Sequence, residues 1–68
     1  MSADRSYMLD DDELAEVSIA YASEKLSLVS TSPMKSGDVT LKVTDGSWVY
    51  VVRVTPHGDW TWGYKYEA

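Results

Sequence analysis

Residues 39–55 read VTLKVTDGSWVYVVRVT, and this stretch decides the fold. Apolar and polar side chains alternate in its first half, which is typical of a strand with one wet face. Asp45 and Gly46 follow, a pair that tolerates positive φ and favours a tight hairpin turn. The second half is apolar on both faces, as expected for the central strand of a sheet. The stretch therefore predicts an antiparallel hairpin with strands over about 39–44 and 48–55.

A two-residue turn at Asp45 and Gly46 sets the predicted pairing of this hairpin. Val43 is then opposite Trp48, and Leu41 is opposite Tyr50. Residues directly opposite each other share a face of the sheet. The apolar residues of both strands are therefore expected on one core-facing side: Val39, Leu41, Val43, Trp48, Tyr50 and Val52.

A third strand is predicted over about 60–67, where large rings recur at every second position. The length of the TPHGD loop before it decides which face the rings occupy, because a shift of one residue turns every side chain over. A loop of two or four residues places them beside Val49 and Val51 as an exposed platform. A loop of three residues places them on the core face. The rings are Trp60, Trp62, Tyr64 and Tyr66.

Turn chemistry favours the three-residue loop. Pro56 suits its first corner, and Gly58 suits the left-handed position that closes such a loop. Val52 is then opposite Trp62, and the rings join the core face. Whether the last two tyrosines close the core rim or begin an interface stays open. The expected solvent side holds two valines and the following polar residues: Thr40, Lys42, Arg53, Thr61, Lys65 and Glu67.

Residues 11–28 predict one helix. They contain no Gly or Pro and are dominated by good helix formers, and the acids at the start complement the helix dipole. Two apolar stripes follow the helical period. We favour one broad core face, with the second stripe at a partner interface as the alternative. The first stripe is Ala15, Ile19, Ala22, Leu26 and Val29, and the second is Leu14, Val17, Tyr21 and Leu28.

The chain of 68 residues permits one domain. We predict an α+β fold in which the helix packs on a three-stranded antiparallel meander, an α-β-β-β domain over residues 10–68. Residues 1–9 are expected to be a flexible arm. The chain has no cysteine, and His57 is its only imidazole, which argues against a zinc site. No stretch is apolar enough for a signal peptide or a membrane span, so a cytoplasmic protein without membrane contact is expected.

The composition argues against several function classes. The formal net charge is −5 and the basic residues are scattered, which argues against nucleic acid as a partner. No paired catalytic groups, glycine-rich phosphate loop or metal-ligand spacing is present, so neither catalysis nor a cofactor is expected. We expect a small acidic protein-binding module: an inhibitor, adaptor or assembly factor, including one encoded by a virus or mobile element. The alternatives are a homo-oligomeric structural subunit such as a homodimer, and an aromatic platform for carbohydrate or single-stranded nucleic acid.

Two groups of side chains are candidates for the partner contact. Tyrosine and tryptophan are enriched at binding hot spots, and a cluster of acids suits a protein partner with a basic surface. The expected contact residues are Trp62, Tyr64, Tyr66, Tyr21, Asp10, Asp11 and Asp12.

Overall fold

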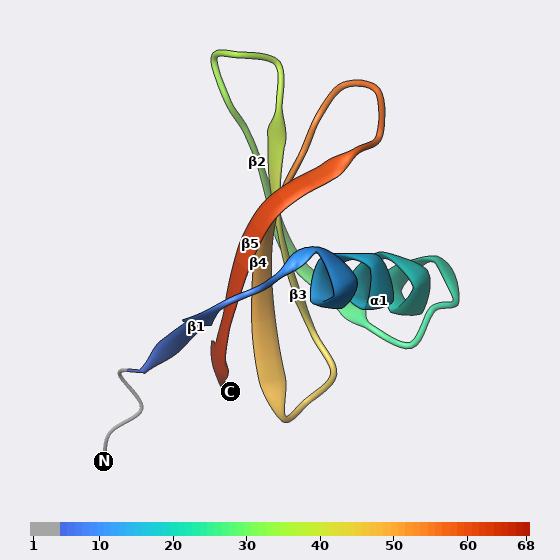
Figure 1. Ribbon diagram of the computed structural model, residues 1–68, viewed down its shortest axis with the longest axis vertical. Coiled ribbons are helices and arrows are strands. Elements are labelled where there is room, and N and C mark those ends of the chain that lie inside the picture. The colour runs from blue at the N-terminus through green and yellow to red at the C-terminus, as the bar shows by residue number, and fades with distance from the viewer. Residues whose placement is uncertain (1–4) are drawn as a thin grey trace.

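The computed structural model describes residues 5–68, which form one helix and a five-stranded antiparallel sheet (Figure 1). The strand order is β1-β5-β4-β3-β2, a four-strand meander with β1 added beside its last strand. The α+β class is confirmed, but the prediction of three strands is wrong, because one further strand lies at each edge. The elements are β1 (Ser6–Met8), α1 (Asp11–Ala22), β2 (Ser27–Pro33), β3 (Val39–Thr44), β4 (Trp48–Val54) and β5 (Trp60–Glu67).

The helix begins where the sequence predicts and ends six residues earlier. Asp10 caps its start, since the Asp10 Oδ1 accepts the N–H of Glu13 at 2.8 Å. At the other end Glu24 takes the left-handed conformation, with φ at 63°. The N–H groups of Glu24 and Lys25 donate back to the carbonyls of Tyr21 and Ala20 at 3.1 and 2.9 Å. This pair of backbone hydrogen bonds is typical of a helix C-terminus, and β2 begins shortly after it.

Glycine at position 24 should stabilise the fold. A left-handed conformation costs an L-residue roughly 1–2 kcal/mol that glycine does not lose, so Glu24→Gly should add about 1 kcal/mol to the free energy of unfolding. Urea denaturation followed by circular dichroism measures it. Ser23→Gly is the matched control, because Ser23 has φ at −88° and its replacement only adds backbone freedom. A gain in both variants would contradict the assigned helix end.

The β3–β4 hairpin has the predicted faces but a different register. Val43 lies opposite Tyr50, and Val39 lies opposite Val54, two residues further along than predicted. The loop is longer because the Asp45 Oδ1 accepts the N–H groups of both Ser47 and Trp48 at 2.8 Å. An even shift keeps every side chain on its side of the sheet, so the predicted core face of this hairpin is confirmed.

The Asp45 turn makes stability depend on acidity. The N–H groups of Trp48 and Ser47 hold the pKa of the Asp45 carboxyl below its ordinary value. Such a carboxyl stabilises the fold above its unfolded pKa of about 3.9 and loses that contribution as the pH falls below it. Asp45→Asn should therefore show a smaller fall in urea midpoint between pH 5 and pH 3 than the wild type. Identical falls would exclude this contribution.

The β4–β5 hairpin begins as predicted and then changes face. The three-residue loop is confirmed: the Thr55 N–H donates to the Asp59 carbonyl at 2.9 Å, Gly58 has φ at 92°, and Val54 lies opposite Trp60. A β-bulge follows directly. Its extra residue is Thr61, so that Arg53 pairs with Trp62.

The bulge overturns the predicted placement of the later rings. Val52 lies opposite Gly63 and Val51 opposite Tyr64, so only Trp60 among the four rings stays on the helix side. Lys65 takes the helix side as well, because it pairs with Tyr50. The predicted solvent position of Lys65 is therefore wrong, and the side of the sheet without the helix gains three large rings.

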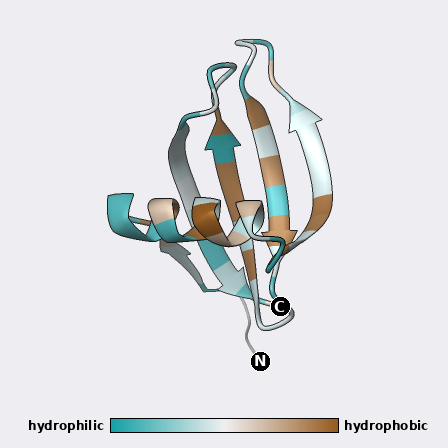
Figure 2. Ribbon diagram, turned by 90° about the vertical axis from the view of Figure 1, so that its right-hand side faces the viewer, coloured by the Kyte–Doolittle hydropathy of each residue, from teal (hydrophilic) through white to brown (hydrophobic). Residues whose placement is uncertain are grey.

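The core lies between α1 and one side of the sheet, and the helix crosses the strands about midway along them (Figure 2). Leu9 after β1 and Leu14 and Val17 of the helix pack on Val43 and Val52, both fully buried. The Leu9 N–H donates to the Gly63 carbonyl at 3.0 Å and joins the first turn to the sheet. The half-buried residues around this cluster are Tyr21, Leu26, Leu41, Tyr50, Val54 and Trp60.

Candidate functional site

The side of the sheet away from α1 has no helix packed on it within residues 5–68 (Figure 1). We call this side the open face. Its members follow from the strand register, in three rows that run across the sheet. The rows are Ser6, Tyr66, Val49, Thr44 and Ser27; Met8, Tyr64, Val51, Lys42 and Ser30; and Trp62, Arg53, Thr40 and Ser32.

Three rings from β5 form a continuous ladder along the open face. The ring centres of Trp62 and Tyr64 are 5.5 Å apart with their planes at 71°, and those of Tyr64 and Tyr66 are 6.3 Å apart at 30°. Both spacings suit attractive aromatic pairs. Trp62 remains 41% exposed, while Val51 beside the ladder is buried. We call Trp62, Tyr64 and Tyr66 the aromatic ladder.

Two cations accompany the aromatic ladder. The Arg53 guanidinium lies 5.6 Å from the ring centre of Trp62, and the Lys42 ammonium lies 5.9 Å from that of Tyr66. Such contacts are worth about 0.5–1 kcal/mol at exposed sites. The Arg53 Nε is shielded from solvent and has no hydrogen-bond partner among the described residues. Lys42 lies on β3 and Arg53 on β4, so two other strands each place a cation near a ring of β5.

Charge is segregated between the two sides of the molecule. The open face carries Lys42 and Arg53, and none of the acidic residues that the structure describes lies on it. The acids lie on the helix, in loops and on the helix side of β5. A chain with a net charge of −5 thus presents one locally positive face.

The expected contact residues are divided between the two sides. The aromatic ladder lies on the open face. Tyr21 lies on the helix side and packs on Trp60 with ring centres 5.9 Å apart, so it belongs to the core rim. Asp10 caps the helix, and Asp11 and Asp12 are exposed in its first turn. The structure therefore does not bring these seven residues together in one surface.

The stripe offered as a partner surface is mostly core. Leu14 and Val17 are buried, whereas Ile19 of the other stripe is 66% exposed. Sequence reasoning also did not assign Arg53 and Lys42 to the site. A glycine inside a strand often marks a bulge or a close approach of the backbone. Gly63 could therefore have indicated that the later rings lie on the face that carries Arg53 and Lys42.

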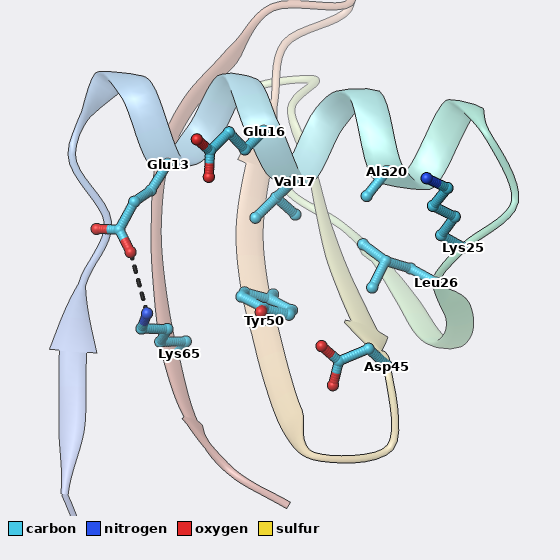
Figure 3. Close-up of a pocket in the computed structure, with 9 residues that line it drawn as sticks. All are labelled: Glu13, Glu16, Val17, Ala20, Lys25, Leu26, Asp45, Tyr50 and Lys65. Atoms are coloured by element: carbon cyan, nitrogen blue, oxygen red, sulfur yellow. Dashed lines mark hydrogen bonds and ion pairs between the residues drawn. The ribbon is translucent and has the colours of Figure 1, made fainter.

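A cleft of about 360 Å³ opens beneath the helix on the other side of the sheet (Figure 3). Three of its five charged side chains, Glu13, Lys65 and Asp45, have partners within the chain, whereas Glu16 and Lys25 have none among the described residues. The Lys65 Nζ donates to the Glu13 Oε2 at 3.0 Å, and this hydrogen bond raises the pKa of Lys65. Asp45 is held by its turn, and burial raises the pKa of Tyr50. The free charges of the cleft are thus one acid and one base, whereas the open face presents two cations and no acid.

Other kinds of site find no support in residues 5–68. No three side chains of His, Cys, Asp or Glu among them gather in a way that could hold a metal ion. In the same part of the chain, α1 is too short and too polar to cross a membrane. No protein-family model, curated protein or solved structure matches the chain.

Proposed function

We propose that this protein is a non-catalytic protein-binding module whose contact surface is the open face. The observation that supports the proposal is the aromatic ladder, held between two cations on a side of the sheet that no described helix covers. Tryptophan, tyrosine and arginine are the residues most enriched at protein-binding hot spots. Inhibitor, adaptor and assembly factor are the roles that the proposal covers.

The ladder favours a protein over a ligand that stacks on rings. A base or a sugar ring needs a free aromatic face. Here Tyr64 has a ring neighbour on each side, and cations lie near the rings of Trp62 and Tyr66. These neighbours limit the free ring faces, and hydroxyl groups and the charges of Arg53 and Lys42 complete the surface offered to a partner. A protein surface of apolar and acidic groups complements such a mixture.

The partner's contact surface should be acidic. Lys42 and Arg53 are the only charged residues in the rows of the open face, so a carboxylate placed there meets attraction and no like charge. Elsewhere the chain is acidic and repels the same partner, which limits how it can dock. Binding should therefore weaken as salt is added, because exposed charges are screened.

Selection from a random displayed-peptide library tests the proposal. Peptides enriched on the wild-type protein should be rich in Asp and Glu with apolar residues between them. For a selected peptide, Trp62→Ala and Arg53→Gln should each weaken the affinity by about tenfold or more, as hot-spot truncations do. Lys25→Gln is the control, since it removes one exposed positive charge from the helix side and should leave the affinity unchanged.

Three results would overturn the proposal. The first is an absence of enriched peptides, and the second is enrichment of basic ones. The third is binding of oligothymidylate or a cello-oligosaccharide that Trp62→Ala abolishes, which would assign the ladder to a stacking ligand instead. Circular dichroism of each variant distinguishes lost binding from lost folding.

A further inference from the structure

The outer edge of β2 is free within residues 5–68. All seven residues of β2 are exposed, and β3 is the only strand of that part of the chain that pairs with β2 (Figure 2). The opposite side of the meander is better covered, because β1 pairs with part of β5 through pairs such as Met8 with Tyr64. A strand edge presents unpaired N–H and C=O groups that another strand can bind.

The composition of β2 offers little protection against such pairing. The strand reads SLVSTSP and has no charged residue, although charged side chains are a common means of blocking an edge. Leu28 and Val29 are 51% and 53% exposed. Two protective features do occur, a bulge at Val29 and a proline at Pro33. Both lie toward the ends of the strand and leave residues 30–32 regular.

We propose that β2 pairs antiparallel with β2 of a second copy of this chain around a two-fold axis. A two-fold axis perpendicular to the sheet brings identical edge strands together in antiparallel order, so the edge complements itself. Because β2 carries no charge, this pairing sets no like charges opposite each other. Pairing through the open faces would bring Lys42 and Arg53 of both copies together, which is repulsive. The second copy therefore binds at the edge.

The small core gives this pairing a role in stability. Among residues 5–68 the buried cluster has five members, and a core of this size often needs a disulfide, a metal or a partner. The chain has no cysteine. Pairing of two β2 edges covers Leu28 and Val29 and joins two sheets into one.

The paired sheet also places the two open faces side by side. Both helices then lie on the opposite side of the joined sheet. This consequence rests on the proposed function: two adjacent open faces would bind one long acidic partner more tightly than either face alone. The pairing itself does not depend on it, so a dimer without acidic-peptide binding would reject the proposed function only.

Sedimentation equilibrium of the wild type and two lysine variants tests the pairing. The wild type should dimerise below millimolar concentration. Val29→Lys places a charge at the β2 edge and should raise the dimer dissociation constant by about tenfold or more. Ile19→Lys is the matched control, because Ile19 is 66% exposed on the helix and lies away from the edge. It should dimerise as the wild type does.

Hydrogen exchange of the wild type gives a second readout that needs no variant. Amides of β2 should become more protected as the protein concentration rises, while those of β1 should not change. A wild type that is monomeric at millimolar concentration would overturn the proposal. Equal loss of the dimer in both lysine variants, or protection that grows at the helix instead of β2, would overturn it as well.

Discussion

Replacing Gly63 with alanine should remove a large part of the domain's free energy of unfolding. A Cβ atom at this position would lie 2.8 Å from the Cγ1 of Val52 and 2.9 Å from the carbonyl oxygen of Val51. Val52 is fully buried, and the oxygen belongs to the central strand, so neither atom can move away cheaply. Overpacking of this kind costs about 1–3 kcal/mol and occasionally more. A core of this size supplies only about 3–5 kcal/mol in total.

Gly58→Ala is the control that isolates the collision. Gly58 has φ at 92°, and no atom lies within 4 Å of a Cβ built on it. Its replacement therefore carries the left-handed strain alone, about 1–2 kcal/mol. Urea denaturation followed by tryptophan fluorescence should rank the wild type first, Gly58→Ala second and Gly63→Ala last. A Gly63→Ala variant as stable as the wild type would contradict the register after the bulge.

The same close approach explains why the later rings leave the helix side. Strict alternation from Trp60 would place Trp62 opposite Val52. That position also lies beside Leu9, whose Cδ1 is 3.1 Å from a Cβ built on Gly63. The space cannot hold an indole. The bulge at Thr61 moves the glycine into this position and sends Trp62 to the open face.

The sequence predicted what local chemistry determines. The bounds of β3 and β5 agree with the prediction, and β4 differs by one residue. The three-residue loop before β5 also agrees, because Pro56 and Gly58 favour one turn type. The bulge was not predictable in the same way. It depends on the contact of Leu9 with Gly63, and these residues lie far apart in the chain.

The two ends of the helix differ in the same way: local sequence marks its start but not its end. Asp10 and the following acids mark its start, which was predicted correctly. Its end carries no glycine or proline, since Glu24 takes the left-handed position itself. Residues 27–28 were therefore included in the helix by propensity, whereas the structure pairs them with β3. Ser6–Met8, within the arm predicted at residues 1–9, is too short to show alternation and forms β1 only by pairing with β5.

The sequence identified the residue types of the candidate site but not the face of the sheet on which they meet. The sequence identified the rings of the aromatic ladder as contact residues, and it placed Arg53 and Lys42 on the solvent side with Val49 and Val51. A single inserted residue brings these two predictions together on one face. Side-chain period alone cannot reveal such an insertion, because the strand before and after it alternates normally.

Leu14→Ala should remove most of the domain's free energy of unfolding, and Ile19→Ala should remove almost none of it. The two residues belong to the two apolar stripes of the helix, and the structure turns only one stripe to the sheet. Leu14 is 4% exposed within the buried cluster, whereas Ile19 is 66% exposed. A buried leucine replaced by alanine costs about 2–5 kcal/mol, and an exposed substitution changes stability by about 0.5 kcal/mol or less.

Urea midpoints of the two alanine variants decide which stripe is buried in solution. A large loss for Leu14→Ala with a wild-type midpoint for Ile19→Ala is expected, because a cavity forms only where neighbours surround the deleted atoms. The reverse order would mean that the stripe of Ile19, and not that of Leu14, packs on the sheet. Comparable losses in both variants would mean that Ile19 is covered as well, and only a further contact outside this chain's own core could cover it.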